Sequence, residues 1–141
     1  MIILDTNVVS ETMRPDPSTN VRGWLDAQPS EDLFLCVPVL AELHYGVEGL
    51  PTGTRRKRLE RAIQLVEEAF ANRILPLDQA AAREYGKIVA QRDRIGRATG
   101  TMDGLIAAIA KAHGATIATR DVHGFDDVGL IVVDPFAHGQ K

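Results

Sequence analysis

The sequence predicts one α/β domain in which a short parallel sheet of four to five strands is flanked by helices on both faces. Short apolar runs alternate along the chain with longer segments whose apolar residues recur at helical spacing. Continuous apolar strands separated by helices are typical of a parallel sheet that is covered on both sides. The 141 residues fit one domain, and no internal repeat or low-complexity tract indicates another architecture.

Two strands and three helices are expected in the first half of the chain. The first apolar run ends at Asp5, which can cap a following helix, and Pro15 and Pro17 separate that helix from the next. Pro38 suits the first turn of the third helix, which Gly49 ends. In chain order, the elements are a strand at residues 1–4, a helix after Asp5, a helix at about 19–27, a strand at 33–37 and a helix at 38–49.

The second half alternates between the same two kinds of element. Residues 54–72 are the clearest amphipathic helix and are expected to form a hairpin with the helix before them. Residues 105–110 are apolar on every side, as a buried central helix is, and Gly114 is its expected C-terminal cap. The other elements are a strand at 74–77, a helix at 78–92, a polar loop at 96–100 and strands at 116–119 and 130–133.

Composition restricts the class of protein. Apolar residues make up 45% of the chain and charged residues 25%, which is typical of a folded soluble domain. The single cysteine, Cys36, cannot form an internal disulfide, and no apolar stretch approaches the ~18 residues that span a bilayer. Because no basic leader segment precedes the first apolar run, we expect a cytoplasmic protein without a membrane anchor.

The net charge does not decide whether the partner is a nucleic acid. Sixteen basic and 19 acidic residues give a formal charge of -3, and acidic proteins are not usual nucleic-acid binders. If four acids bind a cation, however, 16 basic residues remain against 15 acidic ones, and the balance becomes +1.

Four acidic residues are expected at the carboxyl edge of the sheet, where parallel α/β folds place their sites. Asp5 ends the first strand, Glu42 lies one turn into the helix after the second, Asp103 opens the buried helix and Asp121 ends the fourth strand. Grouped carboxylates repel one another unless a cation neutralises them, and Mg²⁺ and Mn²⁺ prefer oxygen ligands. The four acids therefore predict a site for Mg²⁺ or Mn²⁺, and the lack of histidine partners argues against zinc.

Each acid also has a purely structural interpretation. Asp5 can be a helix cap, Asp103 a favourable charge in the first turn of its helix, and Asp121 can close an Asx turn. Glu42 can lie on a solvated helix face, although the nearby Tyr45 makes that face unusually apolar. The joint placement of all four at one sheet edge favours a site.

The four acids belong to short sequence segments. Each segment alone is weak evidence for a protein family, but all of them together in this order are strong evidence. They are Ile3-Leu4-Asp5-Thr6-Asn7, Ala41-Glu42-Leu43 with Gly46, Asp103-Gly104-Leu105-Ile106-Ala107-Ala108, and Ala118-Thr119-Arg120-Asp121 with Phe125. With them, the chain resembles PIN-domain endoribonucleases over nearly its whole length, and most closely the VapC/FitB-like toxins of bacterial toxin-antitoxin pairs.

The resemblance implies a PIN-like three-layer fold, with residues 1–141 as a single PIN domain. It implies an acidic quartet that holds Mg²⁺ or Mn²⁺, formed by Asp5, Glu42, Asp103 and Asp121, with Thr6, Asn7 and Thr119 as supporting polar residues. Many similar proteins have Thr-Arg-Asn where this chain has Thr119-Arg120-Asp121. This difference leaves open whether Asp121 holds the metal directly or through water.

The resemblance also implies a reaction and partners. The reaction is metal-dependent hydrolysis of RNA to 5′-phosphate and 3′-hydroxyl ends, in which a carboxylate orients the attacking water. The partners are the RNA substrate, a second copy in a homodimer and a cognate antitoxin whose C-terminal segment covers the acidic groove. DNA is reached only through the antitoxin.

Basic residues at two places are candidate contacts for RNA phosphates. They are Arg55 and Arg56 at the start of the helix 54–72, and Arg92, Arg94 and Arg97 before Asp103. For the first group the alternative is a solvated helix face, on which Arg56 pairs with Glu60 one turn away.

Three other interpretations stay open. A HAD-type phosphatase has a late acidic pair, for which Asp126 and Asp127 are available, but Asn7 replaces its expected second acid. That pair is more simply interpreted as a solvated turn. A phosphoacceptor receiver domain needs an acidic pair after the first strand, where only Asp5 is present. The third is a catalytically inert PIN scaffold that binds a protein partner.

Overall fold

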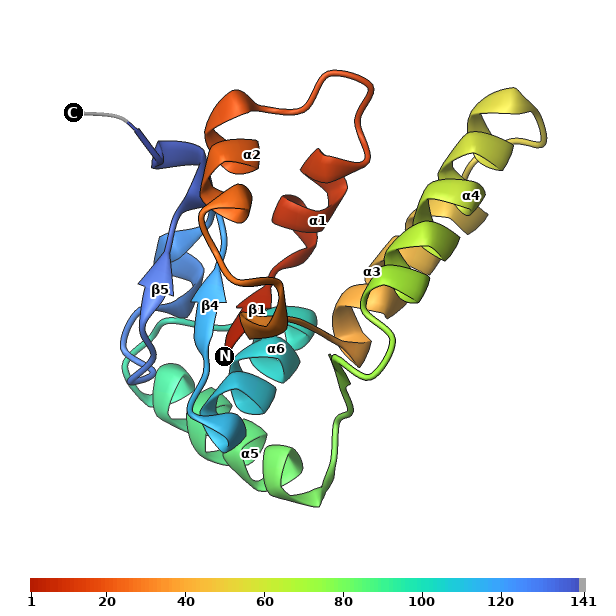
Figure 1. Cartoon of the computed structure of the whole chain (residues 1–141). Coiled ribbons are helices and arrows are strands. Elements are labelled where there is room, and N and C mark those ends of the chain that lie inside the picture. Colours follow the sequence, from red (N-terminus) through yellow and green to blue (C-terminus); the bar gives the residue numbers. More distant parts are fainter. Residues whose placement is uncertain (140–141) are drawn as a thin grey trace.

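The strands form one parallel five-stranded sheet in the order β3-β2-β1-β4-β5. They are β1 (Ile2–Leu4), β2 (Leu33–Cys36), β3 (Ile74–Leu75), β4 (Thr116–Ala118) and β5 (Val132–Val133). Figure 1 labels β1, β4 and β5 of this sheet. The computed structural model describes residues 1–139, so the last two residues of the predicted domain, Gln140 and Lys141, lie outside the described residues. The predicted α/β fold with a short parallel sheet is confirmed.

Six α-helices flank the sheet in the described part of the chain. They are α1 (Thr6–Thr12), α2 (Thr19–Asp26), α3 (Val37–Glu48), α4 (Thr54–Ala69), α5 (Gln79–Arg94) and α6 (Thr101–His113). Three short 3₁₀ helices, η1 (Ser30–Asp32), η2 (Val122–Phe125) and η3 (Pro135–Ala137), complete the elements. Among residues 1–139, no helix combines the length and apolar character needed to cross a bilayer.

The central place of β1 brings distant parts of the chain to one edge of the sheet. Ile3 pairs with Phe34 of β2 on one side and with Ile117 of β4 on the other. Leu4 pairs with Ala118, and the Asp5 N–H donates to the Ala118 carbonyl oxygen at 2.9 Å. The residues that follow β1 and β4 therefore lie side by side, as expected for the carboxyl ends of parallel strands.

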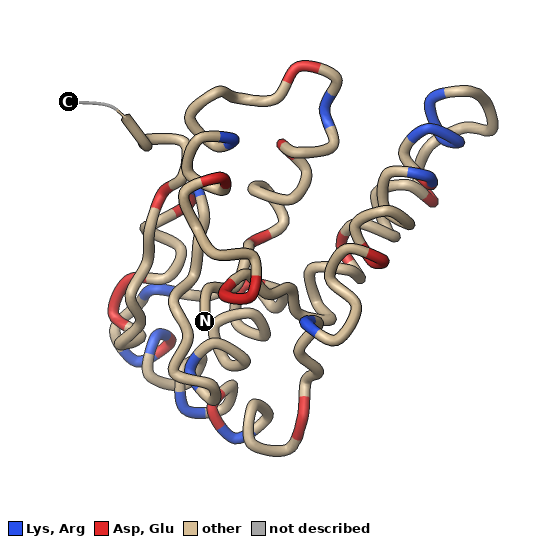
Figure 2. The backbone as a smooth tube through the Cα atoms, viewed as in Figure 1, with Lys and Arg blue, Asp and Glu red and all other residues tan. Residues whose placement is uncertain are grey.

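Helices α3 and α4 form the expected hairpin, which stands away from the sheet in Figure 1. Ile63 and Val47 are buried within it, and His44 Nε2 lies 2.6 Å from Glu67 Oε1 across the two helices. Arg56 pairs with Glu60 on its own helix and with Glu48 on α3. The N···O distance is 2.8 Å in each pair. Figure 2 shows Lys and Arg gathered at the start of α4, near the tip of the hairpin.

Gly104 lets α6 pack closely against α5. A Cβ atom at this position would lie 2.9 Å from Tyr85 Cε2 and 3.2 Å from Val89 Cγ2. We therefore expect Gly104→Ala to lower the free energy of unfolding by about 1–3 kcal/mol through overpacking. A chemical denaturation series measures this loss.

The matched control is Gly86→Ala on the exposed face of α5, where a Cβ atom meets nothing within 4 Å. Alanine in a helix interior is favoured over glycine by about 0.5–1 kcal/mol, so this variant should gain stability. Equal denaturation midpoints for the two variants would contradict the close packing of α6 on α5.

Candidate active site

The structure brings Asp5, Glu42, Asp103 and Asp121 within electrostatic range of one another at the carboxyl edge of the sheet. Asp103, in the first turn of α6, interacts with the charges of the other three acids. Burial, followed by these three charges, raises the pKa of Asp103 from 3.8 to about 6. Arg92 opposes this rise. The site thus carries a concentration of negative charge that its own cations do not neutralise.

Asp5 is both the helix cap and the buried member of this group. Its side chain is buried, and Oδ1 accepts a hydrogen bond from the Thr6 N–H at 2.8 Å, which caps α1. Oδ2 accepts from Thr119 Oγ1 at 2.7 Å and from Asn7 Nδ2 at 3.2 Å. Burial raises the pKa of Asp5, and the hydrogen bond from Thr119 opposes that rise. The helix-cap interpretation of Asp5 is therefore confirmed, and its role in a metal site stays a prediction.

Thr119 and Asn7 join the ends of β1 and β4. The fully buried Thr119 Oγ1 accepts from Asn7 Nδ2 at 3.1 Å and from the Asp121 N–H at 3.0 Å. The Asn7 Oδ1 atom accepts from the Arg120 N–H at 3.1 Å. Both residues thus lie directly beside Asp5, and their supporting role in a site stays a prediction.

Glu42 lies between the acidic group and a cavity of about 420 Å³. Its Oε1 atom accepts a hydrogen bond from Thr6 Oγ1 at 2.6 Å. The cavity is open to solvent on one side and is lined by α1, the segment 13–15 after it, α3 and α4. Its lining is mostly apolar and includes Arg55 and Arg58. Gly46 also lines it, and a Cβ atom there would meet nothing within 4 Å, so Gly46 leaves open space rather than close helix contact.

Asp121 is exposed and caps the N-terminus of η2, as the Asx-turn interpretation requires. Its Oδ1 atom accepts a hydrogen bond from the Gly124 N–H at 3.2 Å. The side chains of Asp5 and Glu42 are also held by hydrogen bonds within the chain. Among residues 1–139, no three carboxylate, histidine or cysteine side chains are close enough to share one metal ion. Metal ligation by the four acids therefore stays a prediction.

The donor set fits a hard divalent cation. The four acids offer only oxygen atoms, which Mg²⁺ and Mn²⁺ prefer. Burial and then the neighbouring acids raise the pKa of Asp103. Such a rise is expected when grouped carboxylates have no positive charge beside them that neutralises them. A cation in their midst removes that repulsion.

The predicted RNA contacts fall into different environments. Arg55 is exposed beside the cavity, and Arg94 is exposed in the last turn of α5. Arg56 is held by its ion pairs on the hairpin. Arg97 lies in the loop after α5 and pairs with Asp127 and, at 3.7 Å, with Asp126.

One expectation needs correction. Arg92, grouped with the candidate phosphate contacts, is 5% exposed and donates to backbone carbonyl groups instead.

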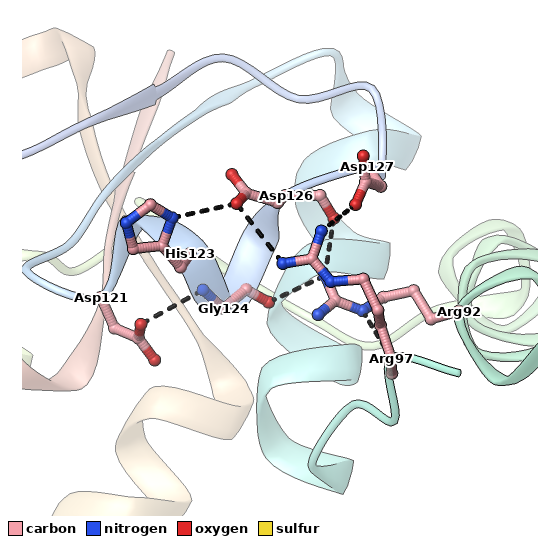
Figure 3. Close-up of polar contacts among 7 residues, drawn as sticks. All are labelled: Arg92, Arg97, Asp121, His123, Gly124, Asp126 and Asp127. Atoms are coloured by element: carbon pink, nitrogen blue, oxygen red, sulfur yellow. Dashed lines mark hydrogen bonds and ion pairs between the residues drawn. The ribbon is translucent and has the colours of Figure 1, made fainter. Parts of the chain in front are cut away.

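Asp126 and Asp127 lie in the turn that follows η2, and their side chains are half-exposed, as the solvated-turn interpretation expects. Both also bind Arg97, and Asp126 binds His123 (Figure 3).

Comparisons with known proteins agree with this architecture. The chain is 42% identical to the VapC ribonuclease Y4jK of Sinorhizobium fredii over 137 residues, which cover 96% of this chain and 98% of that protein. It is also 42% identical to the toxin FitB of Neisseria gonorrhoeae, covering 96% and 99% of the two chains. A structure of FitAB bound to an IR36 DNA fragment superimposes with a TM-score of 0.89 at 41% identity, covering 96% of each chain.

These comparisons give no support to the HAD-type phosphatase, the receiver domain or the inert scaffold. The resemblance found in the sequence is confirmed, because the pattern of the PIN domain matches residues 2–130. The segments that carry it, from Asp5 to Asp121, all fall inside the matched range. The chain therefore belongs to the PIN domain family.

Proposed function

We propose that this chain is a divalent-metal-dependent endoribonuclease and the toxin of a VapBC-type toxin-antitoxin pair. The observation that carries the proposal is the group of four acids at the carboxyl edge of the sheet, with the raised pKa of Asp103. The likeness to the VapC ribonuclease Y4jK and to the toxin FitB supports both parts of the proposal.

The acids have different tasks in the proposed reaction. Asp5 and Asp103 are the direct ligands of Mg²⁺ or Mn²⁺, and Glu42 and Asp121 complete the acidic quartet. The bound cation supplies Lewis-acid stabilisation of the charge that develops on the phosphate. Asp121, the most exposed of the acids, orients a water molecule for in-line attack on phosphorus. Thr119 and Asn7 keep the buried Asp5 carboxylate in place through their hydrogen bonds.

The surroundings of the acids are proposed to hold RNA and the antitoxin. Arg55 and Arg94 are the exposed candidates for phosphate contacts, together with Arg56 and Arg97 if their ion pairs open. A cognate antitoxin covers the acidic groove with its C-terminal segment. The similarity to FitAB on DNA supports a pair that reaches DNA through the antitoxin. We also propose that the chain forms a homodimer and acts in the cytoplasm.

Cleavage of total cellular RNA tests the proposal. The purified protein should produce cuts with 5′-phosphate ends in Mg²⁺ or Mn²⁺, and mapping every new 5′ end identifies the target RNA. A chelator should remove these cuts. Asp26→Asn, which neutralises an exposed acid on α2, should retain them. Cuts that persist in the chelator, or no cuts with any cellular RNA, would count against a metal-dependent ribonuclease.

A further inference from the structure

Arg92 is a buried arginine whose hydrogen-bond partners, within the described residues, are all backbone carbonyl oxygens. It is 5% exposed, and in residues 1–139 no carboxylate lies within ion-pair distance of its guanidinium. Nε donates to the Arg97 carbonyl at 3.0 Å, and Nη1 donates to the Gly124 and Asp126 carbonyls at 3.3 and 2.6 Å (Figure 3). Burying an unpaired cation is costly, so a structural contribution alone is a weak reason for this arginine.

One of these carbonyl groups belongs to the residue that holds Asp121. The Gly124 carbonyl accepts from Arg92, while the Gly124 N–H donates to Asp121 Oδ1 at 3.2 Å. A Cβ atom on Gly124 would lie 2.7 Å from Asp121 Oδ2, so the Asp121 carboxylate packs closely against this glycine. Gly124 thus connects the buried guanidinium to an acid of the proposed site.

Arg92 also fixes the segment that leads to Asp103. Its backbone carbonyl accepts from the Arg97 N–H at 2.8 Å, while its side chain donates to the Arg97 carbonyl. Arg92 therefore binds both the N–H and the carbonyl group of Arg97. These two bonds fix the loop 95–100 immediately before α6 begins. A single side chain on α5 holds the segments that carry two of the four acids.

We infer that Arg92 is a positioning residue, which sets Asp121 relative to Asp103 through Gly124 and the loop 95–100. The inference rests on the proposed function, in which both acids serve RNA cleavage. The outer ion pairs of Arg97 with Asp126 and Asp127 are half-exposed, and such pairs contribute little. The buried contacts of Arg92 are the ones that define the geometry.

Arg92→Lys separates positioning from charge. A guanidinium is a planar fork with several donors, whereas an ammonium group is a compact point charge that cannot reach carbonyls on two segments in the same way. The variant keeps the positive charge beside Asp103 and loses the contacts to Gly124 and Arg97. A purely electrostatic role would survive the change.

The test combines an NMR readout of Gly124 with kinetics of RNA cleavage. In Arg92→Lys, we expect the Gly124 amide signal to shift and its hydrogen exchange to accelerate about tenfold or more. We expect kcat to fall about 10- to 100-fold at nearly unchanged KM, the range seen when a group that orients a ligand is removed. Ile88→Val, which removes one buried methyl group from α5, is the control and should keep the parent values within about twofold.

Several outcomes overturn the inference. A parental Gly124 signal and exchange rate in Arg92→Lys would do so whatever the activity, and so would an equal fall of kcat in Ile88→Val. If the parent protein cleaves no RNA, the proposed function fails, while the amide measurement still decides whether Arg92 positions Gly124. Should Arg92→Lys not fold, Gly124→Ala displaces the Asp121 carboxylate from the other side, and a parental Asp121 amide signal in that variant would contradict the connection.

Discussion

Replacing Asp103 by asparagine should lower the rate of RNA cleavage by more than about 100-fold and at the same time stabilise the metal-free protein. The loss of activity follows because a direct ligand contributes at least as much as the groups that orient ligands, whose removal costs about 10- to 100-fold. The gain in stability follows because Asp103 is charged at neutral pH although burial and three neighbouring acids oppose that charge.

The sign of the stability effect follows from the two pKa values of Asp103. The ordinary value of 3.8 applies to the unfolded chain, and the folded protein has a pKa of about 6. Between these values the folded state binds more protons than the unfolded state, so the free energy of unfolding falls as the pH rises from about 4 to 6 and stays lower above. With solvent screening of this half-buried group, Asp103→Asn should gain about 1 kcal/mol at pH 7.

Thermal unfolding at pH 4 and pH 7 measures this effect, with EDTA present or with Mn²⁺ added. The parent and Asp103→Asn should have similar Tm values at pH 4 in EDTA, and the variant the higher Tm at pH 7. Mn²⁺ should raise the Tm of the parent more than that of the variant, since a ligand stabilises the state that binds it. A variant that is less stable at pH 7 in EDTA, or one that still cleaves RNA, would remove Asp103 from the proposed site.

Replacing Thr119 by valine should have the largest effect on stability. Valine has nearly the same shape and lacks the hydroxyl that serves Asp5, Asn7 and the Asp121 N–H at once. Leaving buried polar groups unsatisfied costs about 1–3 kcal/mol, and more for a charged group. Because the buried Asp5 carboxylate loses its shortest contact, we expect a loss of about 3 kcal/mol and a fall in cleavage rate of about 10- to 100-fold.

Thr116→Val is the matched control for this second prediction. Thr116 begins the same strand, and within residues 1–139 its side chain has no hydrogen bond to another residue. Urea denaturation of the two variants should therefore show a clear loss for Thr119→Val and little change for Thr116→Val. Similar denaturation midpoints for the two variants would mean that the hydrogen bonds of the Thr119 hydroxyl do not stabilise the carboxyl edge of the sheet.

The fold was predictable because its elements have strong local signals. The run before Asp5 and the apolar helix before Gly114 appear where the pattern placed them, and Gly114 adopts the left-handed cap with φ of 63°. Element ends were less predictable. The last strand is shorter than its apolar run, since Ile131 is 70% exposed and β5 begins only at Val132. The apolar run predicts that a strand is present, whereas the pairing with β4 determines at which residue β5 begins.

The site was predictable where its residues follow strands, and not where it depends on contacts between loops. Asp5, Asn7 and Thr119 follow strand ends, so topology alone places them together. The pairing of Arg97 with Asp127 joins residues 30 apart in two irregular segments, for which the sequence has no periodic signal. Arg92 did carry a signal, because it continues the buried positions Ala81 and Ile88 along one face of α5. A cation at such a position predicts a buried contact.

The contact between Asp5 and Thr119 spans 114 residues, and this separation has a consequence for synthesis of the protein. β1 leaves the ribosome first, yet one of its two partners in the sheet is β4, near the other end of the chain. Domains complete their folding only when their long-range partners have been made, and non-local pairing of this kind is slow. A nascent chain that has not reached Thr119 cannot assemble the proposed site, so we expect it to cleave no RNA. We expect activity to begin only after Thr119 and Asp121 have been made and β4 has paired with β1.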